Sequence, residues 1–279
     1  MTYLIADSGA TKTKWCLESD SVSESFYTEG LNPYYHTTST ISDVINKELV
    51  PKLKGHHVDA IYFYGAGCDS PVNEDTVYKS LNAIFPDAKM DVEHDLLGSA
   101  RACFFDKPGI ACIFGTGSNT CLYDGKKIQE HIPSLAFILG DEGSAGYFGK
   151  KLINSYFRFE VPDDLKKELE EAHNMDLNHI MTSVYEGSQT SRFVASYARF
   201  LGEHTGHPWV DKILREGFNS CITRIIKNYT DAASHKVSFV GSVAHAHQDL
   251  IKELLNEEGL QCGSFYRNPL DRLITYHTG

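Results

Sequence analysis

The chain contains 279 residues, which is longer than an average domain and long enough for two lobes with separate hydrophobic cores. Its formal net charge of −11 argues against a general nucleic-acid binder, which needs clustered Lys and Arg. No apolar run reaches the about 18 residues of a membrane span, and the sequence begins with a strand-like segment instead of a basic and apolar leader. We therefore expect a cytoplasmic protein that binds neither nucleic acid nor a membrane.

The seven cysteines are scattered along the chain, and no two of them stand in a Cys-x-x-Cys spacing. A zinc or iron–sulfur site would normally show such a spacing. Most of the cysteines lie inside apolar runs, so we expect buried, reduced thiols and no metal bound by cysteine.

The first half of the chain predicts strands and helices in an order that starts with three consecutive strands. Strands are expected at residues 2–6, 13–17, 22–27, 60–64 and 89–93, and helices near residues 41–52, 74–85 and 96–105. A tight turn at Gly9 and Ala10 separates the first two strands.

The three-strand pattern recurs near residue 110. Strands are expected at residues 110–114, 119–123, 127–132 and 237–240, and helices at 144–157, 163–173, 177–185, 192–204, 208–233 and 249–258. The repeat predicts a duplicated α/β architecture with a cleft between two lobes, residues 1–109 and 110–279. It leaves open whether the last helix returns to the N-terminal lobe.

The turn between the first two strands has the chemistry of a phosphate-binding loop. Gly9 permits close approach of an anion to the backbone, whose N–H groups can form a nest. Further donors are available from Thr11, Thr13, Lys12 and Lys14. Asp7, at the end of a buried strand, is placed to hold Mg²⁺ through water. An ordinary β-hairpin would explain this loop equally well.

A second loop with Gly and hydroxyl residues, Gly115-Thr116-Gly117-Ser118, occupies the same place in the repeated meander. Two such loops could hold a phosphate chain from both sides, which a single hairpin cannot do. The repetition therefore favours phosphate binding over two unrelated turns.

Three further segments carry candidate site residues. Asp95 stands at a strand-to-helix junction, where it could act as a general base, cap the helix, or do both. Asp141 and Glu142 lie between glycines and could accept hydrogen bonds from sugar hydroxyls, although composition alone favours a helix cap. Gly241 and Ser242 follow the late strand, where an adenosine could pack on the backbone or an ordinary turn could occur.

Competing nucleotide and nucleophile motifs do not occur. The sequence contains no GxxxxGK[ST], no GxGxxG and no GxSxG. These absences argue against a P-loop NTPase, a dinucleotide-binding domain and an α/β-hydrolase nucleophile elbow.

Taken together, these segments resemble the N-acetylglucosamine kinase branch of the BadF/BadG/BcrA/BcrD ATPase family, within the actin/hexokinase/Hsp70 superfamily. The resemblance spans nearly the whole chain, and its most specific parts are residues 7–15, 114–119 and 140–145. It implies two ribonuclease-H-like lobes with a duplicated βββαβα core, Mg-ATP in the cleft, and lobe closure on a sugar.

The resemblance also implies roles for individual residues. Asp95 resembles the catalytic base. The phosphate positions that the resemblance implies are Thr11, Thr13, Thr116 and Gly117, beside Gly9, Lys12 and Gly115, which the loop chemistry suggests. The adenosine positions are Gly241 and Ser242, and the sugar positions are Asn32, Ser118 and Asp141. The implied activity is ATP-dependent phosphorylation of N-acetylglucosamine or a related amino sugar, at the 6-hydroxyl, by a protein compatible with a homodimer.

Three segments depart from the family pattern, and two alternatives stay open. Residues 134–139 contain less glycine, the adenosine motif has one glycine where two are common, and residues 269–272 lack a final glycine. One alternative is an ATPase that activates a partner dehydratase through an iron–sulfur cluster, although no cysteine ligand loop is visible. The other is a sugar-sensing protein without catalysis, against which the retained Asp7 and Asp95 argue.

Overall fold

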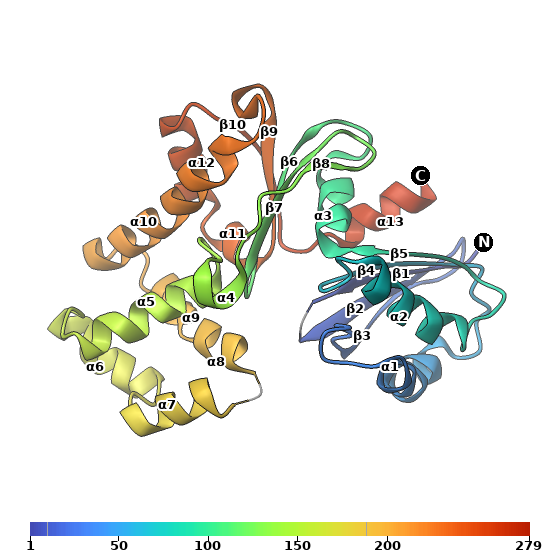
Figure 1. Cartoon of the computed structure of the whole chain (residues 1–279), viewed down its shortest axis with the longest axis horizontal. Helices are drawn as coiled ribbons and strands as arrows, with labels where there is room; N and C mark the ends of the chain where they lie inside the picture. Colours follow the sequence, from blue (N-terminus) through green and yellow to red (C-terminus); the bar gives the residue numbers. More distant parts are fainter. Residues whose placement is uncertain (10, 188) are drawn as a thin grey trace. The chain divides into compact units, whose positions relative to one another are not determined.

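The computed structural model describes residues 1–9, 11–187 and 189–279, which form two compact units (Figure 1). Unit 1 comprises Met1–Lys107, Gly125–Lys127 and Asn268–Gly279, and unit 2 comprises Pro108–Asp124 and Ile128–Arg267. The last helix of the chain therefore belongs to unit 1. Among the described residues, no helix has both the length and the apolar character needed to cross a bilayer.

Unit 1 is built on a five-stranded mixed sheet with the order β3-β2-β1-β4-β5. Its strands are β1 Tyr3–Ser8, β2 Lys12–Glu18, β3 Ser23–Glu29, β4 Ala60–Gly65 and β5 Lys89–His94. The first three form an antiparallel meander, and β4 and β5 run parallel to β1. Ser8, Gly65 and His94 stand in register, so the segments that follow these three strands leave the sheet at one edge.

Helices cover both faces of this sheet because successive strand residues point to opposite sides. Leu4 and Ala6 face a core that includes Ile41 and Val77, whereas Ile5 faces a core that includes Leu270. The first face is covered by α1 Thr38–Val44 and α2 Pro71–Asn82, and the second by α3 Asp95–Phe104 and α13 Leu270–Thr278. Asp7, two residues after Ile5, shares the face of α3 and α13.

The helix expected at residues 41–52 is not one regular helix. α1 continues as a π-helix at Ile45–Leu49 and then as a 3-10 helix at Val50–Leu53. Pro51 stands in the first turn of the 3-10 helix, and because it has no N–H it cannot continue an α-helical bonding pattern.

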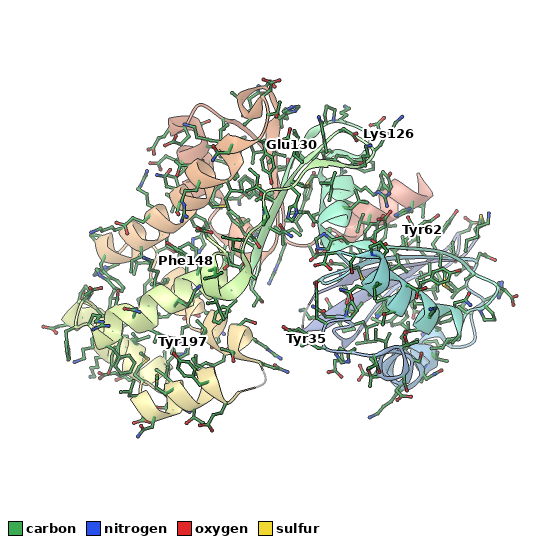
Figure 2. The ribbon with its side chains drawn as sticks, viewed as in Figure 1. Tyr35, Tyr62, Lys126, Glu130, Phe148 and Tyr197 are labelled. Atoms are coloured by element: carbon green, nitrogen blue, oxygen red, sulfur yellow. The ribbon has the colours of Figure 1, made fainter. Side chains whose placement is uncertain are left out.

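The C-terminal helix α13 is held on the sheet by an aromatic and polar cluster. The ring of His277 stacks on Tyr62, which is labelled in Figure 2, with a centroid distance of 3.6 Å. Its Nε2 lies 2.8 Å from the hydroxyl of Tyr64. Arg101 of α3 donates to that hydroxyl oxygen at 2.8 Å, so the Tyr64 O–H donates to His277. Burial lowers the pKa of His277 to about 4, which keeps its ring neutral and able to accept.

Unit 2 repeats the sheet of unit 1, with the order β8-β7-β6-β9-β10. Its strands are β6 Gly109–Phe114, β7 Ser118–Tyr123, β8 Ile128–Glu130, β9 Lys236–Val240 and β10 Gln261–Tyr266. The antiparallel meander again comes first, and β9 and β10 again run parallel to the first strand. The predicted α/β fold with a duplicated ribonuclease-H-like core is therefore confirmed.

Helices make up the rest of unit 2, and one core cluster joins them to the sheet. They are α4 Ala136–Leu139, α5 Ala145–Phe157, α6 Asp163–Ala172, α7 Leu177–Tyr185, α8 Thr190–Ser196, α9 Ala198–Glu203, α10 Pro208–Arg224, α11 Ser242–Ala246 and α12 Gln248–Glu257. The single helix expected at 192–204 is wrong, because Tyr197 bonds to Val194, three residues back, and separates α8 from α9. The helix expected at 208–233 ends at Arg224, and two 3-10 turns follow.

Candidate active site

Two carboxylates meet at the edge of the unit 1 sheet where the parallel strands end. Asp7 lies on β1 opposite Lys14 of β2, and Asp95 is the first residue of α3, directly after β5. Burial and the nearby charge of Asp95 raise the pKa of Asp7 to about 7, while Lys14 and Lys12 act in the opposite direction. Asp7 therefore interacts electrostatically with Asp95, Lys14 and Lys12, and these four residues form one candidate site.

Asp95 does not cap its helix. The N-cap position belongs to His94, and Asp95 is already helical, so the capping interpretation is wrong by one residue. The carboxylate of Asp95 accepts from the backbone N–H of Leu96, and its Oδ1 lies 3.1 Å from Nε2 of His94. Burial raises the pKa of Asp95, His94 lowers it, and Asp69 raises it. A raised pKa suits a general base, which works best when its pKa approaches the working pH.

The first phosphate loop is a tight turn in which Gly9 N–H donates to the carbonyl of Lys12 at 3.1 Å. Thr13 does not present its hydroxyl to the loop surface: it is fully buried, 2.7 Å from the hydroxyl of Ser8, and donates to the carbonyl of Glu29. The prediction that the Thr13 hydroxyl donates a hydrogen bond to phosphate is therefore corrected: this hydroxyl stabilises the hairpin. Thr11 is partly exposed, whereas Lys12 lies over the ring of Tyr27 at 5.2 Å. Ala10 lies outside the described residues.

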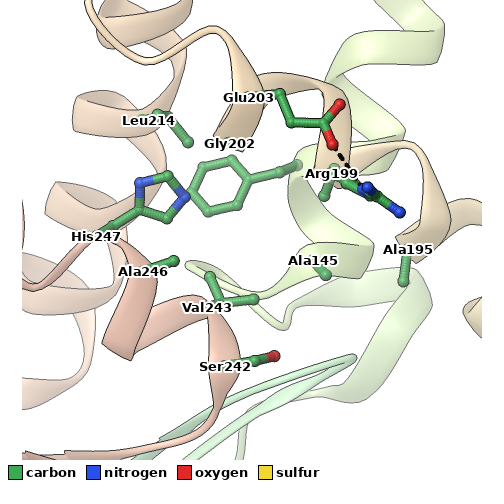
Figure 3. Close-up of a pocket in the computed structure, with 12 residues that line it drawn as sticks. Ala145, Ala195, Arg199, Gly202, Glu203, Leu214, Ser242, Val243, Ala246 and His247 are labelled. Carbon is green, nitrogen blue, oxygen red and sulfur yellow. Dashed lines mark hydrogen bonds and ion pairs between the residues drawn. The ribbon is translucent and has the colours of Figure 1, made fainter. Parts of the chain in front are cut away.

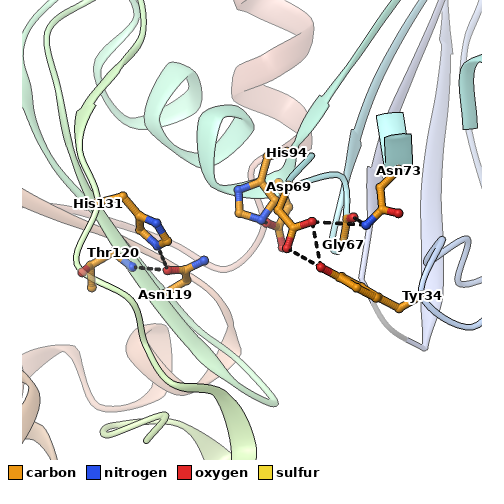
Figure 4. Close-up of polar contacts among 9 residues, drawn as sticks. Tyr34, Gly67, Asp69, Asn73, His94, Asn119, Thr120 and His131 are labelled. Carbon is orange, nitrogen blue, oxygen red and sulfur yellow. Dashed lines mark hydrogen bonds and ion pairs between the residues drawn. The ribbon is translucent and has the colours of Figure 1, made fainter. Parts of the chain in front are cut away.

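The predicted sugar residue Asn32 contacts Tyr34 and Gly67, which belong to loops joined by hydrogen bonds (Figure 4). Its Oδ1 accepts from the N–H of Tyr34 at 2.9 Å, and its side chain packs on the backbone of Gly67. The hydroxyl of Tyr34 donates to the carboxylate of Asp69 at 3.0 Å, and Nδ2 of Asn73 donates to the same carboxylate at 3.2 Å. The sequence analysis missed Asp69, whose signal is its place just after the Gly-rich end of β4.

The second phosphate loop connects β6 to β7 in unit 2. Gly115 N–H donates to the carbonyl of Gly117 at 3.0 Å, which makes the turn tight and leaves Thr116 exposed. The carbonyls of Gly115 and Thr116 accept from the N–H groups of Ala145 and Gly146, both at 2.9 Å. The loop is therefore fixed to the first turn of α5.

Asp141 lies over this loop. A Cβ on Gly117 would come within 2.8 Å of its Oδ2, and its carboxylate accepts from the backbone N–H of Ser118 and from the side chain of Ser134. Burial raises the pKa of Asp141, and these hydrogen bonds lower it. The N-cap of α5 is Ser144, which accepts from Tyr147 N–H at 3.1 Å, so the helix-cap interpretation of the two acids is wrong.

The partner of Asp141 in the acidic pair has a different environment. Glu142 is buried and pairs with Arg224 of α10 at 2.7 Å. Only Asp141 of the two acids therefore contacts the loop at Gly117.

The predicted adenosine motif packs on the start of the second phosphate loop. Gly241 has φ of +119°, and a Cβ there would overlap the carbonyl of Phe114 and lie 3.3 Å from the nitrogen of Gly115. Ser242 is the first residue of α11 and is exposed. The two motifs that the sequence placed far apart are therefore neighbours in unit 2.

This close packing makes Gly241 irreplaceable for stability. We expect Gly241→Ala to lower the free energy of unfolding by about 2–4 kcal/mol, because the new methyl group would clash with backbone and the positive φ strains any other residue. Gly115→Ala is the matched control, since a Cβ at Gly115 would meet no atom within 4 Å. Chemical denaturation of both variants checks this, and equal stabilities would contradict it.

A pocket of about 460 Å³ opens beside these two motifs in unit 2 (Figure 3). Its lining is mostly small or apolar: Ala145, Phe148, Ala195, Ala198, Gly202, Leu214, Ser242, Val243, Ala246 and His247, with the ion pair of Arg199 and Glu203. Burial lowers the pKa of His247, so its ring is uncharged at neutral pH. The sequence analysis found only Ser242, although small residues three to four positions apart on α8 and α9 mark one wall.

The residues of unit 1 also fit a magnesium ion. Within residues 1–9, 11–187 and 189–279, no three His, Cys, Asp or Glu side chains gather into a complete metal site. Mg²⁺ is commonly held by one or two carboxylates together with water and substrate phosphates. The hard carboxylate oxygens of Asp7 match that preference.

The chain matches no protein-family model and no curated protein. It is 34% identical to a candidate N-acetylglucosamine kinase from Porphyromonas gingivalis, with a TM-score of 0.94 over 99% of this chain and 98% of that one. A candidate N-acetylglucosamine kinase from Chromobacterium violaceum is 14% identical, with a TM-score of 0.75 over 99% and 98% of the two chains. A ROK-family glucokinase from Streptomyces griseus, solved with glucose and AMPPNP, is 16% identical, with a TM-score of 0.60 over 100% of both.

The last two similarities show the fold alone. The first combines 34% identity with coverage of nearly the whole of both chains, and it agrees with the resemblance seen in the sequence. The chain belongs to the family of N-acetylglucosamine kinase-like proteins.

Proposed function

We propose that this protein is an ATP-dependent sugar kinase that phosphorylates N-acetylglucosamine or a related amino sugar at its 6-hydroxyl. The observation that carries the proposal is the pair of Asp7 and Asp95 at one sheet edge, where their interaction and burial raise the pKa of Asp7 to about 7. Such a pair supplies both a cation-binding carboxylate and a base. The name of the Porphyromonas gingivalis relative supports the choice of sugar.

Asp7 would hold Mg²⁺ through water, and the ion would neutralise charge on the ATP phosphates. A proton on Asp7 competes with the cation, so binding of Mg²⁺ would release that proton. Lys14, which lies opposite Asp7 on β2, and Thr11 are suited to bind phosphate oxygens in unit 1.

Asp95 would accept the proton of the sugar 6-hydroxyl while the oxygen of that hydroxyl attacks the γ-phosphorus of ATP. The bond from that phosphorus to the bridging oxygen breaks, and the electron pair leaves with ADP. A positioned base contributes about 10²–10⁴-fold to such a step, and positioning with charge neutralisation supplies the remainder. Asn32, Ser118 and Asp141 would bind sugar hydroxyls.

The pocket in unit 2 would hold the adenine. Its walls of alanine and glycine leave a flat, apolar space beside Gly241, and Ser242 and Ala145 connect it to the loop at Gly115. Backbone N–H groups of Thr116 and Gly117 would then face the phosphates. Small apolar pockets with few polar groups are typical ligand sites.

The sugar kinase, the activating ATPase and the non-catalytic sugar sensor differ in whether they consume ATP and a sugar. Six of the seven cysteines are buried, which disfavours a cluster-binding activator of a partner enzyme. An ADP-release assay with N-acetylglucosamine, glucosamine, N-acetylmuramic acid, glucose and N-acetylmannosamine tests the proposal. We expect ADP release that depends on an amino sugar. Sugar binding without ADP release would indicate a sensor, and ADP release independent of sugar would indicate an activating ATPase.

Filling the proposed adenine pocket should weaken nucleotide binding selectively. A Cβ at Gly202 meets nothing closer than 3.8 Å, so Gly202→Leu can fold while its side chain enters the pocket. We expect KM for ATP to rise about 10- to 100-fold, equivalent to about 1.4–2.8 kcal/mol, with KM for the sugar within twofold. Ala172→Leu, at an exposed position of α6, is the control. Equal nucleotide KM values for both variants would place the adenine elsewhere.

A further inference from the structure

We infer that His94 is a positioning residue for Asp95, holding one carboxylate oxygen so that the other can accept the sugar proton. The inference rests on the proposed function, since it assigns a second residue to the same reaction. His94 lies where a helix-capping side chain would normally be, but its ring makes no cap hydrogen bond. Instead, its Nε2 lies 3.1 Å from Oδ1 of Asp95, the next residue along the chain.

Contact between the side chains of neighbouring residues is unusual in a helix, because positions i and i+1 point in different directions. It occurs here because His94 keeps an extended backbone, with φ of −64° and ψ of 141°, while Asp95 is helical. The strand-to-helix junction thus turns the imidazole towards the carboxylate. Both side chains remain accessible, with 19% of His94 and 23% of Asp95 exposed, so the pair can face a substrate.

Two groups contact the Asp95 carboxylate and restrain it. Nε2 of His94 lies within hydrogen-bond reach of Oδ1, and the backbone N–H of Leu96 donates to the carboxylate from within α3. A carboxylate held by two donors has little rotational freedom, and its remaining lone pairs point in fixed directions. Catalysis depends on such fixed geometry, since an error of about 1 Å can cost about 100-fold in rate.

The surroundings of Asp95 give His94 a second effect. Asp69, after β4, places negative charge near this carboxylate. Burial and Asp69 both raise the pKa of Asp95. His94 and the backbone N–H of Leu96 act in the opposite direction.

Replacing His94 tests this role through the separation of kcat from KM. We expect His94→Phe, which keeps a ring of similar size but removes the donor, to lower kcat about 10- to 100-fold. KM for ATP and for the sugar should stay within about twofold, because the variant leaves both binding sites intact. His94→Gln retains an N–H donor and should recover most of the lost kcat.

Thermal unfolding of both variants shows whether they fold, and a purely structural role would lower the stability of both without restoring kcat in the glutamine variant. That pattern, or an unchanged kcat in His94→Phe, would overturn the inference.

A crystal structure of each protein provides a readout that needs no turnover. We expect the Asp95 side chain to occupy one rotamer in the wild-type protein and several rotamers in His94→Phe. The same single rotamer in both would overturn the positioning role. Absence of kinase activity in the wild-type protein would instead reject the proposed function, so the two failures can be told apart.

Discussion

Replacing Asp95 by Asn is expected to lower kcat about 10²–10⁴-fold while ATP binding is kept. The amide has nearly the same shape as the carboxylate, so it preserves packing at the start of α3, but it cannot accept the sugar proton. Because Asp95 does not line the proposed adenine pocket, the nucleotide affinity should change little.

Steady-state kinetics and calorimetric titration with ATP measure these two quantities. Asp87→Asn makes the same chemical change at an exposed position of unit 1 and serves as the control. Full activity in Asp95→Asn would remove Asp95 from the role of base.

Replacing Asp7 by Asn is expected to abolish most Mg²⁺-dependent turnover and yet to stabilise the protein above pH 7. The pKa of Asp7 rises from 3.8 to about 7 on folding. The folded state therefore keeps a proton that the unfolded state releases, and wild-type stability falls as the pH rises from about 4 to about 7. The full cost above pH 7 is about 1–4 kcal/mol, which the neutral amide avoids.

Urea denaturation without Mg²⁺ or ATP, at pH 8 and at pH 5.5, measures this effect. The variant should be more stable than the wild-type protein at pH 8, and its advantage should shrink at pH 5.5. Asp20→Asn, at an exposed turn, should show no such difference. A variant that is less stable at pH 8 would show that the Asp7 carboxylate is stabilising in the folded state. Higher stability of Asp7→Asn at pH 8 would show that Asp7 is a site residue kept for function at the expense of stability.

The meander repeat could be read from the sequence because its strands alternate or are fully apolar and end in turn residues. Other elements gave weaker signals. α4 and α11 are too short to show a helical period, and β10 contains an irregularity between Cys262 and Phe265 that breaks its alternation. The order of strands in each sheet depends on pairing between distant segments, so the repeat suggested it but local pattern could not establish it.

The carboxylates of the candidate site were predictable because parallel strands deliver their ends to one edge of a sheet. The direction in which a side chain points at a turn could not be predicted from the sequence. Thr13 faces Ser8 only because β2 pairs with β1 in the observed register. The contact of His94 with Asp95 depends on a change of backbone conformation between adjacent residues, which composition does not reveal.

The pocket in unit 2 could not be predicted from the sequence either. Its walls come from α5, α8, α9, α10, α11 and the start of α12, which are far apart in the sequence and meet only after packing. Sequence analysis therefore identified residues at strand ends better than residues brought together by helices.

Phosphorus-31 NMR of the protein incubated with Mg-ATP and N-acetylglucosamine tests the central claim most directly. The account predicts a new phosphomonoester signal from the sugar 6-phosphate, growing in equal amount with ADP, and its near absence with Asp95→Asn. Conversion of ATP to ADP and inorganic phosphate, with no sugar phosphate formed from any amino sugar, would contradict it.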